Sequence, residues 1–223
     1  IRQGEVMVPF SFHGDEMRLI GGRALFWPRE QALLVADLHL EKASFFARHG
    51  QMLPPYDSRE TLERVALAIR ETGARRVFTL GDNFHDRDGA ERLEPHAAGM
   101  LAALTRAVDW VWVTGNHDGG STLGTEVEEL AVSGLLLRHE SQPGETRPEL
   151  SGHFHPKYRA SARGRSVSRP CFVAGKTKLI FPAFGSLTGG LHADHPEIRA
   201  ASGGGAEALI ASRGRLLRFP LDR

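Results

Sequence analysis

The stretch Arg76-Val77-Phe78-Thr79-Leu80-Gly81-Asp82-Asn83-Phe84-His85-Asp86 begins as an apolar, β-branched run and ends abruptly in polar side chains. Residues 76–80 are typical of a buried strand, which stops at Gly81. Asp82 follows at once, so the sequence predicts a carboxylate at the carboxyl edge of that strand. Open α/β sheets build their functional sites at this edge.

Four further apolar runs end in residues that commonly bind metals. They are Leu33–Ala36 before Asp37 and His39, Trp110–Thr114 before Asn116, His117 and Asp118, Leu135–Leu137 before His139, and Leu150–Ser151 before His153 and His155. Oxygen and imidazole ligands without thiolate favour a hydrolytic dinuclear site for Mn, Fe or Zn over a structural zinc site. Asp82 is the predicted bridge, because two cations about 3.5–4 Å apart need an anionic group between them and a carboxylate offers two oxygens.

The order of these blocks, Asp-x-His, Gly-Asp-x-x-His, Gly-Asn-His-Asp, a lone His and Gly-His-x-His, resembles the calcineurin-like metallophosphoesterase family. The resemblance runs from residue 37 to residue 155. It implies two divalent metal ions, with Mn²⁺ favoured over Fe or Zn. It also assigns their ligands: Asp37, His39, Asp82 and His155 for one ion, and Asp82, Asn116, His139 and His153 for the other.

The expected fold is an α/β, four-layer αββα sandwich of two mixed β-sheets, formed by residues 1–223 as a single metallophosphoesterase domain. Apolar residues at helical spacing predict a crossover helix that ends at Gly73, with Asp57 as its N-cap and Glu60 completing a capping box. Residues 93–108 predict a second crossover helix, and residues 126–130 a polar, helical turn. Short C-terminal strands supply the remainder of the sheets.

Bulk properties limit the function further. The chain has 223 residues, is 41% hydrophobic and carries a net charge of +1, so any nucleic-acid affinity must come from a local patch. The single cysteine, Cys171, cannot form an intramolecular disulfide, and no apolar stretch reaches the roughly 18 residues of a membrane span. We therefore expect a cytoplasmic protein with no membrane partner.

The resemblance also implies catalytic roles. With metals activating water, no protein nucleophile is required, and His117 is the candidate general acid, oriented by Asp118 or His85. The alternative for His117 is a supporting role without proton transfer. The Gly-Asp-x-Phe-His form around His85 resembles the nuclease branch of the family, where this histidine supports the catalytic one; the alternative is a solvated loop histidine.

Candidate substrate contacts lie outside these motifs. Lys42, near the start of a helix predicted over residues 41–49, is a candidate phosphate contact or an ordinary exposed lysine. Arg159 and Arg163 belong to a basic run from Lys157 to Lys178 that contains no acidic residue and is a candidate polyanion surface or a set of exposed bases. Glu41 replaces the glycine of related sequences and is expected to weaken phosphate binding.

Three functions are compatible with these features. Pro182-Ala183-Phe184-Gly185 followed by Thr188-Gly189-Gly190 resembles the bacterial DNA-ligase-associated metallophosphoesterases. This implies a phosphodiesterase or endonuclease acting on DNA in repair, with DNA ligase and helicase as partners. The alternatives are hydrolysis of a small nucleotide-linked pyrophosphate and a catalytically silent scaffold. The basic run favours DNA, and the retention of His117 and all metal positions argues against the scaffold.

Overall fold

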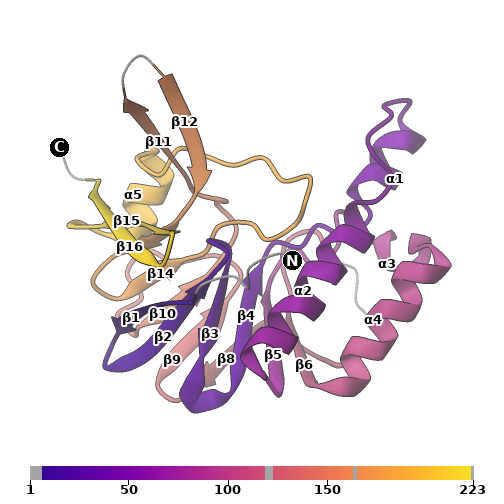
Figure 1. Ribbon diagram of the computed structural model, residues 1–223, viewed down its shortest axis with the longest axis horizontal. Coiled ribbons are helices and arrows are strands. Elements are labelled where there is room, and N and C mark those ends of the chain that lie inside the picture. The colour runs from indigo at the N-terminus through magenta and orange to yellow at the C-terminus, as the bar shows by residue number, and fades with distance from the viewer. Residues whose placement is uncertain (1–6, 119–122, 163–164, 222–223) are drawn as a thin grey trace.

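The computed structural model describes residues 7–118, 123–162 and 165–221. Two seven-stranded sheets pack face to face, and helices lie on their outer faces (Figure 1). Both sheets are mixed, because each contains parallel and antiparallel strand pairs. The predicted α/β sandwich of two mixed sheets is therefore confirmed.

The first sheet has the strands in chain order. Their bounds are β1 Val8–Phe12, β2 Asp15–Ile20, β3 Ala24–Trp27, β4 Ala32–Ala36, β5 Arg76–Leu80, β6 Asp109–Val113 and β7 Thr125–Val127. Strands β1 to β4 are antiparallel, whereas β4 to β7 are parallel. The carboxyl ends of β4, β5 and β6 consequently meet at one edge, as the sequence predicted.

The second sheet has the order β16-β15-β13-β14-β10-β9-β8. Its strands are β8 Glu129–Val132, β9 Leu135–Arg138, β10 Glu149–Ser151, β13 Phe172–Ala174, β14 Lys178–Ile180, β15 Glu207–Ser212 and β16 Arg215–Pro220. The helical turn predicted over residues 126–130 is wrong, because this segment is divided between β7 and β8. Both are edge strands with several exposed polar side chains, so their sequence lacks the apolar alternation of a strand.

Three apolar clusters hold the layers together. Between the sheets, Trp27 and Phe78 lie in one cluster with Phe172 and Phe181. On the outer face of the first sheet, residues of α2 (Asp57–Thr72) and α4 (Pro95–Ala107) pack on β5 and β6, where both tryptophans of β6 are buried. On the outer face of the second sheet, α5 (Pro196–Ser202) packs on β13 and β14. These layers fix the edge at which the strand ends converge.

Three details of the helices differ from prediction. Asp57 does not cap its own helix, because its Oδ2 accepts the N–H of Ala43 in α1 (Lys42–Arg48), 3.0 Å away, so the predicted capping box is wrong. The second crossover begins with α3 (Gly89–Arg92) and continues in α4, where Glu94 is the N-cap. The sequence analysis did not predict helix α5 or the short 3₁₀ helix η1, which spans Pro28–Glu30.

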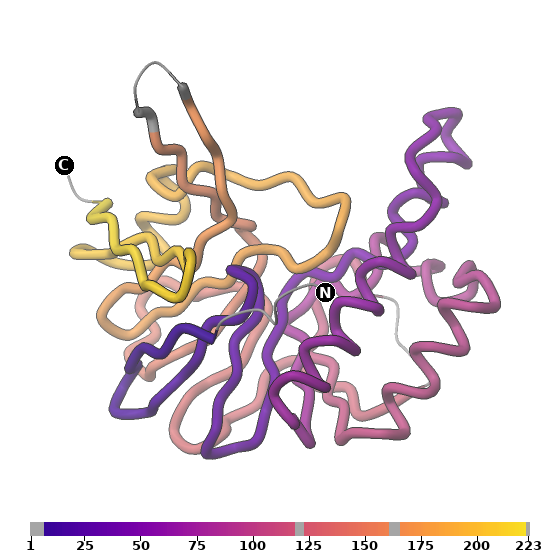
Figure 2. Tube along the Cα trace, in the orientation of Figure 1, coloured from indigo at the N-terminus to yellow at the C-terminus, as the bar shows by residue number. Residues whose placement is uncertain are grey.

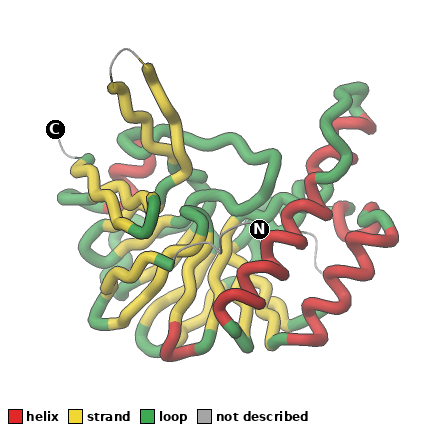
Figure 3. The backbone as a smooth tube through the Cα atoms, viewed as in Figure 1, coloured by secondary structure: helices red, strands yellow, loops and turns green. Residues whose placement is uncertain are grey.

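Two elements project beyond the sheets. Figures 1 and 2 show α1 on one side and the two-stranded ribbon of β11 (Lys157–Ala162) and β12 (Arg165–Pro170) on the other. Figure 3 shows the first projection as helix and the second as strand, and short segments, residues 37–41 and 152–156, lead into them from β4 and β10. Because α1 begins shortly after His39 and β11 shortly after His155, both projections start beside the predicted metal ligands.

No helix within the described ranges is both long enough and apolar enough to cross a membrane.

Candidate metal centre

The loops that follow the inner strands bring the predicted aspartate and histidine ligands together. Asp37 directly follows β4 and Asp82 comes just after β5, while His139 follows β9 and His153 comes just after β10. The ligand atoms form two groups whose members lie within 4.8 Å of one another: Asp37, His39, Asp82 and His155 in the first, and Asp82, His139 and His153 in the second. Asp82 belongs to both groups.

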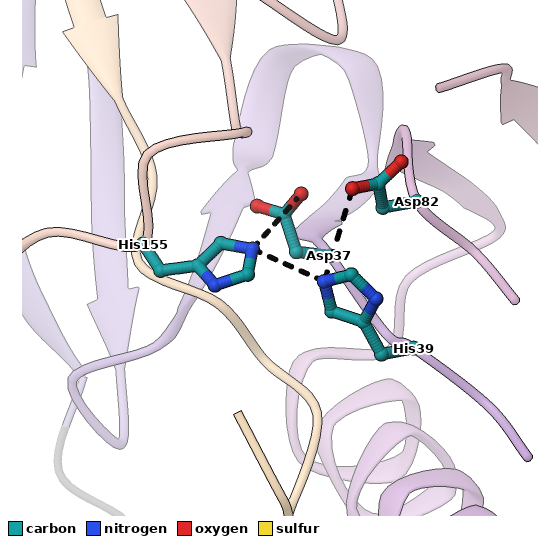
Figure 4. A group of neighbouring side chains, drawn as sticks. All are labelled: Asp37, His39, Asp82 and His155. Atoms are coloured by element: carbon teal, nitrogen blue, oxygen red, sulfur yellow. Dashed lines mark hydrogen bonds and ion pairs between the residues drawn. The ribbon is translucent and has the colours of Figure 1, made fainter. Parts of the chain in front are cut away.

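In the first group, two imidazoles and two carboxylates point toward one another (Figure 4). The Nε2 atoms of His39 and His155 are 3.2 Å apart. Asp82 Oδ2 lies 3.8 Å from His39 Nε2, and Asp37 Oδ1 lies 3.5 Å from His155 Nε2. Nitrogen and oxygen lone pairs therefore converge on one shared space.

The second group uses the other oxygen of the same carboxylate. Asp82 Oδ1 lies 3.5 Å from His139 Nε2, and His139 Nε2 is 3.0 Å from His153 Nδ1. Glu140, which sequence reasoning overlooked, lies at the rim with Oε1 3.8 Å from His153 Nε2. The two oxygens of Asp82 are thus divided between two sets of imidazoles, which is the arrangement that a bridging ligand requires.

The chemistry of these groups fits divalent cations. Within the described ranges, Asp37 and Asp82 form ion pairs only with histidines, and no lysine or arginine reaches them. Two neighbouring buried carboxylates are strongly unfavourable unless a cation offsets their charge. The imidazole nitrogens of His139 and His153 lie 3.0 Å apart, and those of His39 and His155 lie 3.2 Å apart. Each pair is therefore placed to bind one cation. Oxygen and imidazole ligands of this kind suit Zn, Fe and Mn.

The backbone is strained where it carries the ligands. Asp37, His39, Asp82, His153 and His155 have φ values of 52°, 45°, 44°, 73° and 49°, all in the left-handed region. Each such residue costs about 1–2 kcal/mol relative to the right-handed region. Strain of this kind persists only where the surroundings enforce it, and it is concentrated at functional sites. The left-handed backbone conformation turns these side chains from short loops toward the shared site.

Two glycines make the close packing feasible. A Cβ on Gly81 would lie 1.9 Å from His139 Nδ1, and Gly81 itself has a φ of 74°. A Cβ on Gly115 would lie 2.2 Å from the backbone nitrogen of Asp82. Both glycines belong to the sequence motifs, but the sequence analysis gave them no role. Their positions directly before predicted ligands could have indicated that a side chain does not fit there.

The loop after β6 runs past Asp82. The N–H of His117 donates to Asp82 Oδ1 at 3.3 Å, and His117 Nε2 lies 4.0 Å from Asp82 Oδ2. The His117 side chain is 55% exposed, so it is accessible from solvent beside the bridging carboxylate. Asn116 is also exposed and lies on the same loop, and its role as a ligand stays a prediction.

Asp118 organises the backbone beside the bridge. Its carboxylate accepts the N–H groups of Asn83, Phe84 and Gly115 at 2.8, 3.0 and 2.7 Å. Asn83, another residue missed by sequence reasoning, adds its side-chain amide at 2.9 Å. Burial raises the pKa of Asp118, and the three backbone hydrogen bonds oppose this. These contacts fix the segment that carries Asp82, while an orienting role toward His117 stays a prediction.

His85 lies next to both His117 and the first metal group. Its ring is stacked at 6.3 Å from that of His117 and lies 5.7 Å from that of His39. Burial lowers the pKa of His85, and the positive charge of Lys42 lowers it further. His85 is half-buried rather than a freely solvated loop residue, and its supporting role toward His117 stays a prediction.

Burial lowers the pKa of His39 to about 2, and repulsion from other positive groups, chiefly His155 and Lys42, lowers it further. The imidazole is consequently neutral at physiological pH. Neutral imidazole is the form that binds metals.

The predicted substrate contacts divide into three cases. Lys42 is half-buried beside the site, and burial lowers its pKa, an effect that Asp57 opposes and Lys157 reinforces. Arg159 is exposed on β11 and borders a surface cavity with Tyr158 and His192. Arg163 lies outside the described residues.

The expectation that Lys178 belongs to an exposed basic run is wrong, and the start of α1 and Glu41 both have partners within the chain. The start of α1 offers no free N–H for an anion at Ala43, because Asp57 accepts it. Lys178 is not part of an exposed basic run, since it is buried and its Nζ donates to Glu149 at 2.7 Å. Glu41 is absent from both metal groups; its Oε1 accepts the hydroxyl hydrogen of Ser58 at 2.7 Å, which directs the carboxylate to α2.

Comparisons with known proteins agree with this geometry. Residues 31–194 match the family model described as calcineurin-like phosphoesterase. The nuclease MPE of Pseudomonas putida has a similar structure, with 29% sequence identity, a TM-score of 0.74, and coverage of 96% of this chain and 100% of that chain. The phosphoesterase Yfce of E. coli is more distant, with 16% identity, a TM-score of 0.40, and coverage of 86% and 93%. No curated protein sequence matches the chain significantly.

Proposed function

Because this chain belongs to the calcineurin-like phosphoesterase family and is a metal-dependent phosphoesterase, we propose that it hydrolyses phosphodiester bonds of DNA. The observation that carries the proposal is Asp82, whose two oxygens face two separate imidazole groups. The proposed ligands are those that the sequence assigned: Asp37, His39, Asp82 and His155 for one ion, and Asp82, Asn116, His139 and His153 for the other. We propose Mn²⁺ as the ion.

Two bound cations supply an activated water near neutral pH and offset the charge of the phosphoryl oxygens. The residues of the chain would hold the two cations and keep the ligand side chains in position. Asp82 keeps the two ligand groups in register, and the hydrogen bonds of Asp118 hold the backbone of residues 83 and 84 behind it. No serine, threonine or cysteine is required as a nucleophile, and Cys171 is buried, with its pKa raised to about 12 by burial.

His117 is the proposed general acid. It is exposed, and its Nε2 lies 4.0 Å from Asp82 Oδ2, so the imidazole reaches the edge of the site without belonging to either ligand group. A proton from this nitrogen would neutralise the leaving alkoxide. We propose that His85, whose ring lies nearly parallel to that of His117 with the centres 6.3 Å apart, helps to orient it.

Two observations support DNA as the substrate. The nuclease of P. putida is similar over 96% of this chain. The site also lies between two projections whose first residues are Lys42 and Lys157, and the charge of Lys157 contributes to lowering the pKa of Lys42. Lysines in such positions would contact the phosphates on either side of the cleaved bond. We further propose a cytoplasmic location and a role in repair alongside DNA ligase and helicase, for which the motif of residues 182–190 argues.

The proposal is tested with metal-stripped protein to which Mn²⁺ is returned. We expect hydrolysis of bis-p-nitrophenyl phosphate well above that of p-nitrophenyl phosphate, together with cleavage of single- or double-stranded DNA. Lys157→Ala should weaken DNA cleavage and make it less sensitive to salt, because one phosphate contact is lost. A strict preference for the monoester, or activity only on a nucleotide-linked pyrophosphate, would contradict the proposal.

A further inference from the structure

A line of aromatic rings runs outward from the metal centre to α1. The ring of His39 lies 5.7 Å from that of His85. The ring of His85 lies in turn 4.7 Å from Phe45 and 5.6 Å from Phe46. These rings connect the first metal group directly with a helix that projects from the body of the protein (Figure 1).

Phe45 and Phe46 do not contribute to the cores of the protein. Both are only half-buried, and neither belongs to the three apolar clusters found among the described residues. The ring of Phe45 has His49 4.5 Å away in addition to Phe46 and His85, whereas among the described residues Phe46 has only Phe45 and His85 as aromatic neighbours. Partly exposed apolar side chains that gather at one place, outside the cores, are typical of binding surfaces.

The base of α1 is firmly held. Besides the contact between Ala43 and Asp57, the N–H of Glu41 donates to Ser58 Oγ at 2.8 Å. Arg92 donates from Nε to Ser44 Oγ at 3.1 Å. The two phenylalanines are therefore positioned before any ligand arrives, and a rigid aromatic surface binds with little loss of conformational entropy.

The charge around these rings suits an anionic ligand. Helix α1 contains no acidic residue, and it carries Lys42 in its first turn and Arg48 in its last. The nearby carboxylate of Asp86 is already paired with Arg92. A ligand that combines planar rings with negative charge, namely a nucleotide, matches both properties. An apolar peptide would gain nothing from the two cations.

We propose that Phe46, supported by Phe45 and His85, forms a stacking subsite for a nucleobase next to the phosphodiester that is cleaved. This inference rests on the proposed function and adds to it the recognition of a base. Stacking on an aromatic side chain requires that the base be unpaired and accessible. The backbone phosphates are left to the metal centre and the lysines.

The test compares two single-stranded oligomers of equal length and charge, one of thymidylate and one of the stable tetrahydrofuran abasic analogue, at the same salt concentration. We expect the Mn²⁺-loaded wild type to cleave the thymidylate oligomer about 5- to 100-fold more efficiently in kcat/KM, since each stacked base contributes this much. Phe46→Ala should reduce this ratio toward one. Phe46→Trp should keep it, whereas Phe46→Leu, which is apolar but lacks a π face, should not.

Circular dichroism and the thermal midpoint establish that each variant is folded. Equal cleavage of the two oligomers by the wild type, or a preference that survives in Phe46→Ala, would overturn the stacking subsite while the proposed function stands. Failure to cleave either oligomer or bis-p-nitrophenyl phosphate would instead reject the proposed function, and the subsite with it.

Discussion

Glu149 and Asp37 both have completely buried carboxylates, but the groups that surround these two charges differ. Glu149 accepts hydrogen bonds from Lys178 Nζ at 2.7 Å and from the N–H of Gln142 at 3.1 Å, and Arg138 approaches at 3.4 Å. Among the described residues, the carboxylate of Asp37 accepts a hydrogen bond only from the N–H of His153, and its ion-pair partners are imidazoles. One cluster contains its own cations, whereas the other leaves its charge to be offset from outside.

The backbone shows the same contrast. Glu149, Arg138 and Lys178 all have ordinary right-handed or extended backbone, whereas Asp37 and Asp82 have positive φ values. A self-sufficient ion cluster can form from side chains of regular strands. A cluster that awaits a ligand must instead aim its side chains at a common point, which short strained loops achieve. The pairing of buried charge within the chain therefore distinguishes a structural cluster from a binding site.

The largest expected effect concerns the metal centre, and it tests the role of His117 beside it. His117→Ala should retain both metals yet lose about 10²- to 10⁴-fold in kcat on a DNA diester, because a positioned proton donor is removed. The deficit should shrink on bis-p-nitrophenyl phosphate, whose leaving group departs without a proton. His96→Ala, on the exposed surface of α4, is the control. Equal losses on both substrates would argue against the general-acid role.

The next prediction concerns the self-sufficient cluster. Glu149→Gln leaves Lys178 and Arg138 buried beside a neutral group, which should lower the free energy of unfolding by about 3–5 kcal/mol. Denaturant titration of the chelator-treated protein measures this loss. Glu63→Gln removes the partner of Arg59 on the exposed face of α2 and should change the midpoint little. A similar small change for Glu149→Gln would show that the cluster is not important for stability.

The third prediction is that neutralising a buried carboxylate stabilises the metal-free protein when the carboxylate belongs to the metal centre, the opposite of the effect expected for Glu149. In metal-free protein, Asp82→Asn removes one of two neighbouring buried charges and should raise the free energy of unfolding by about 1–3 kcal/mol. With Mn²⁺ present, the wild type should become the more stable of the two, because bound ligand stabilises the folded state. If the metal-free variant were less stable than wild type, the contrast between the two clusters would fail.

The smallest effect is a dependence on pH. The pKa of His39 is about 2 in the folded protein and about 6.5 when unfolded, so the unfolded state binds the additional proton between these values. Stability of the metal-free protein should therefore fall as the pH drops below about 6.5, by about 1–2 kcal/mol from pH 7 to pH 5. His39→Gln should show a correspondingly weaker slope. Identical slopes would mean that His39 is readily protonated in the folded state.

Much of this architecture could be predicted because it depends on patterns of neighbouring residues in the sequence. Apolar runs that end close to a ligand residue indicated β4, β5, β6, β9 and β10, and parallel pairing brings the ends of such strands to one edge. The polar edge strands β7 and β8 were missed, because pairing with a neighbour, rather than apolar alternation, makes them strands.

Other features depend on contacts between distant residues. Lys178 looked like one base in an exposed run, and only the fold places it against Glu149. Asp57 had the sequence of an N-cap, yet its oxygen is used by α1. The grouping of the candidate ligands followed from family resemblance, whereas the opposed directions of the two Asp82 oxygens are visible only in three dimensions.

The most direct test of the central claim is the metal content of the purified protein, measured by elemental analysis after Mn²⁺ loading and removal of free ions. If Asp82 joins two sites, the wild type should retain two ions per chain, and Asp82→Asn should lose most of both while remaining folded. Retention of two ions by Asp82→Asn, or a single ion in the wild type, would contradict the account.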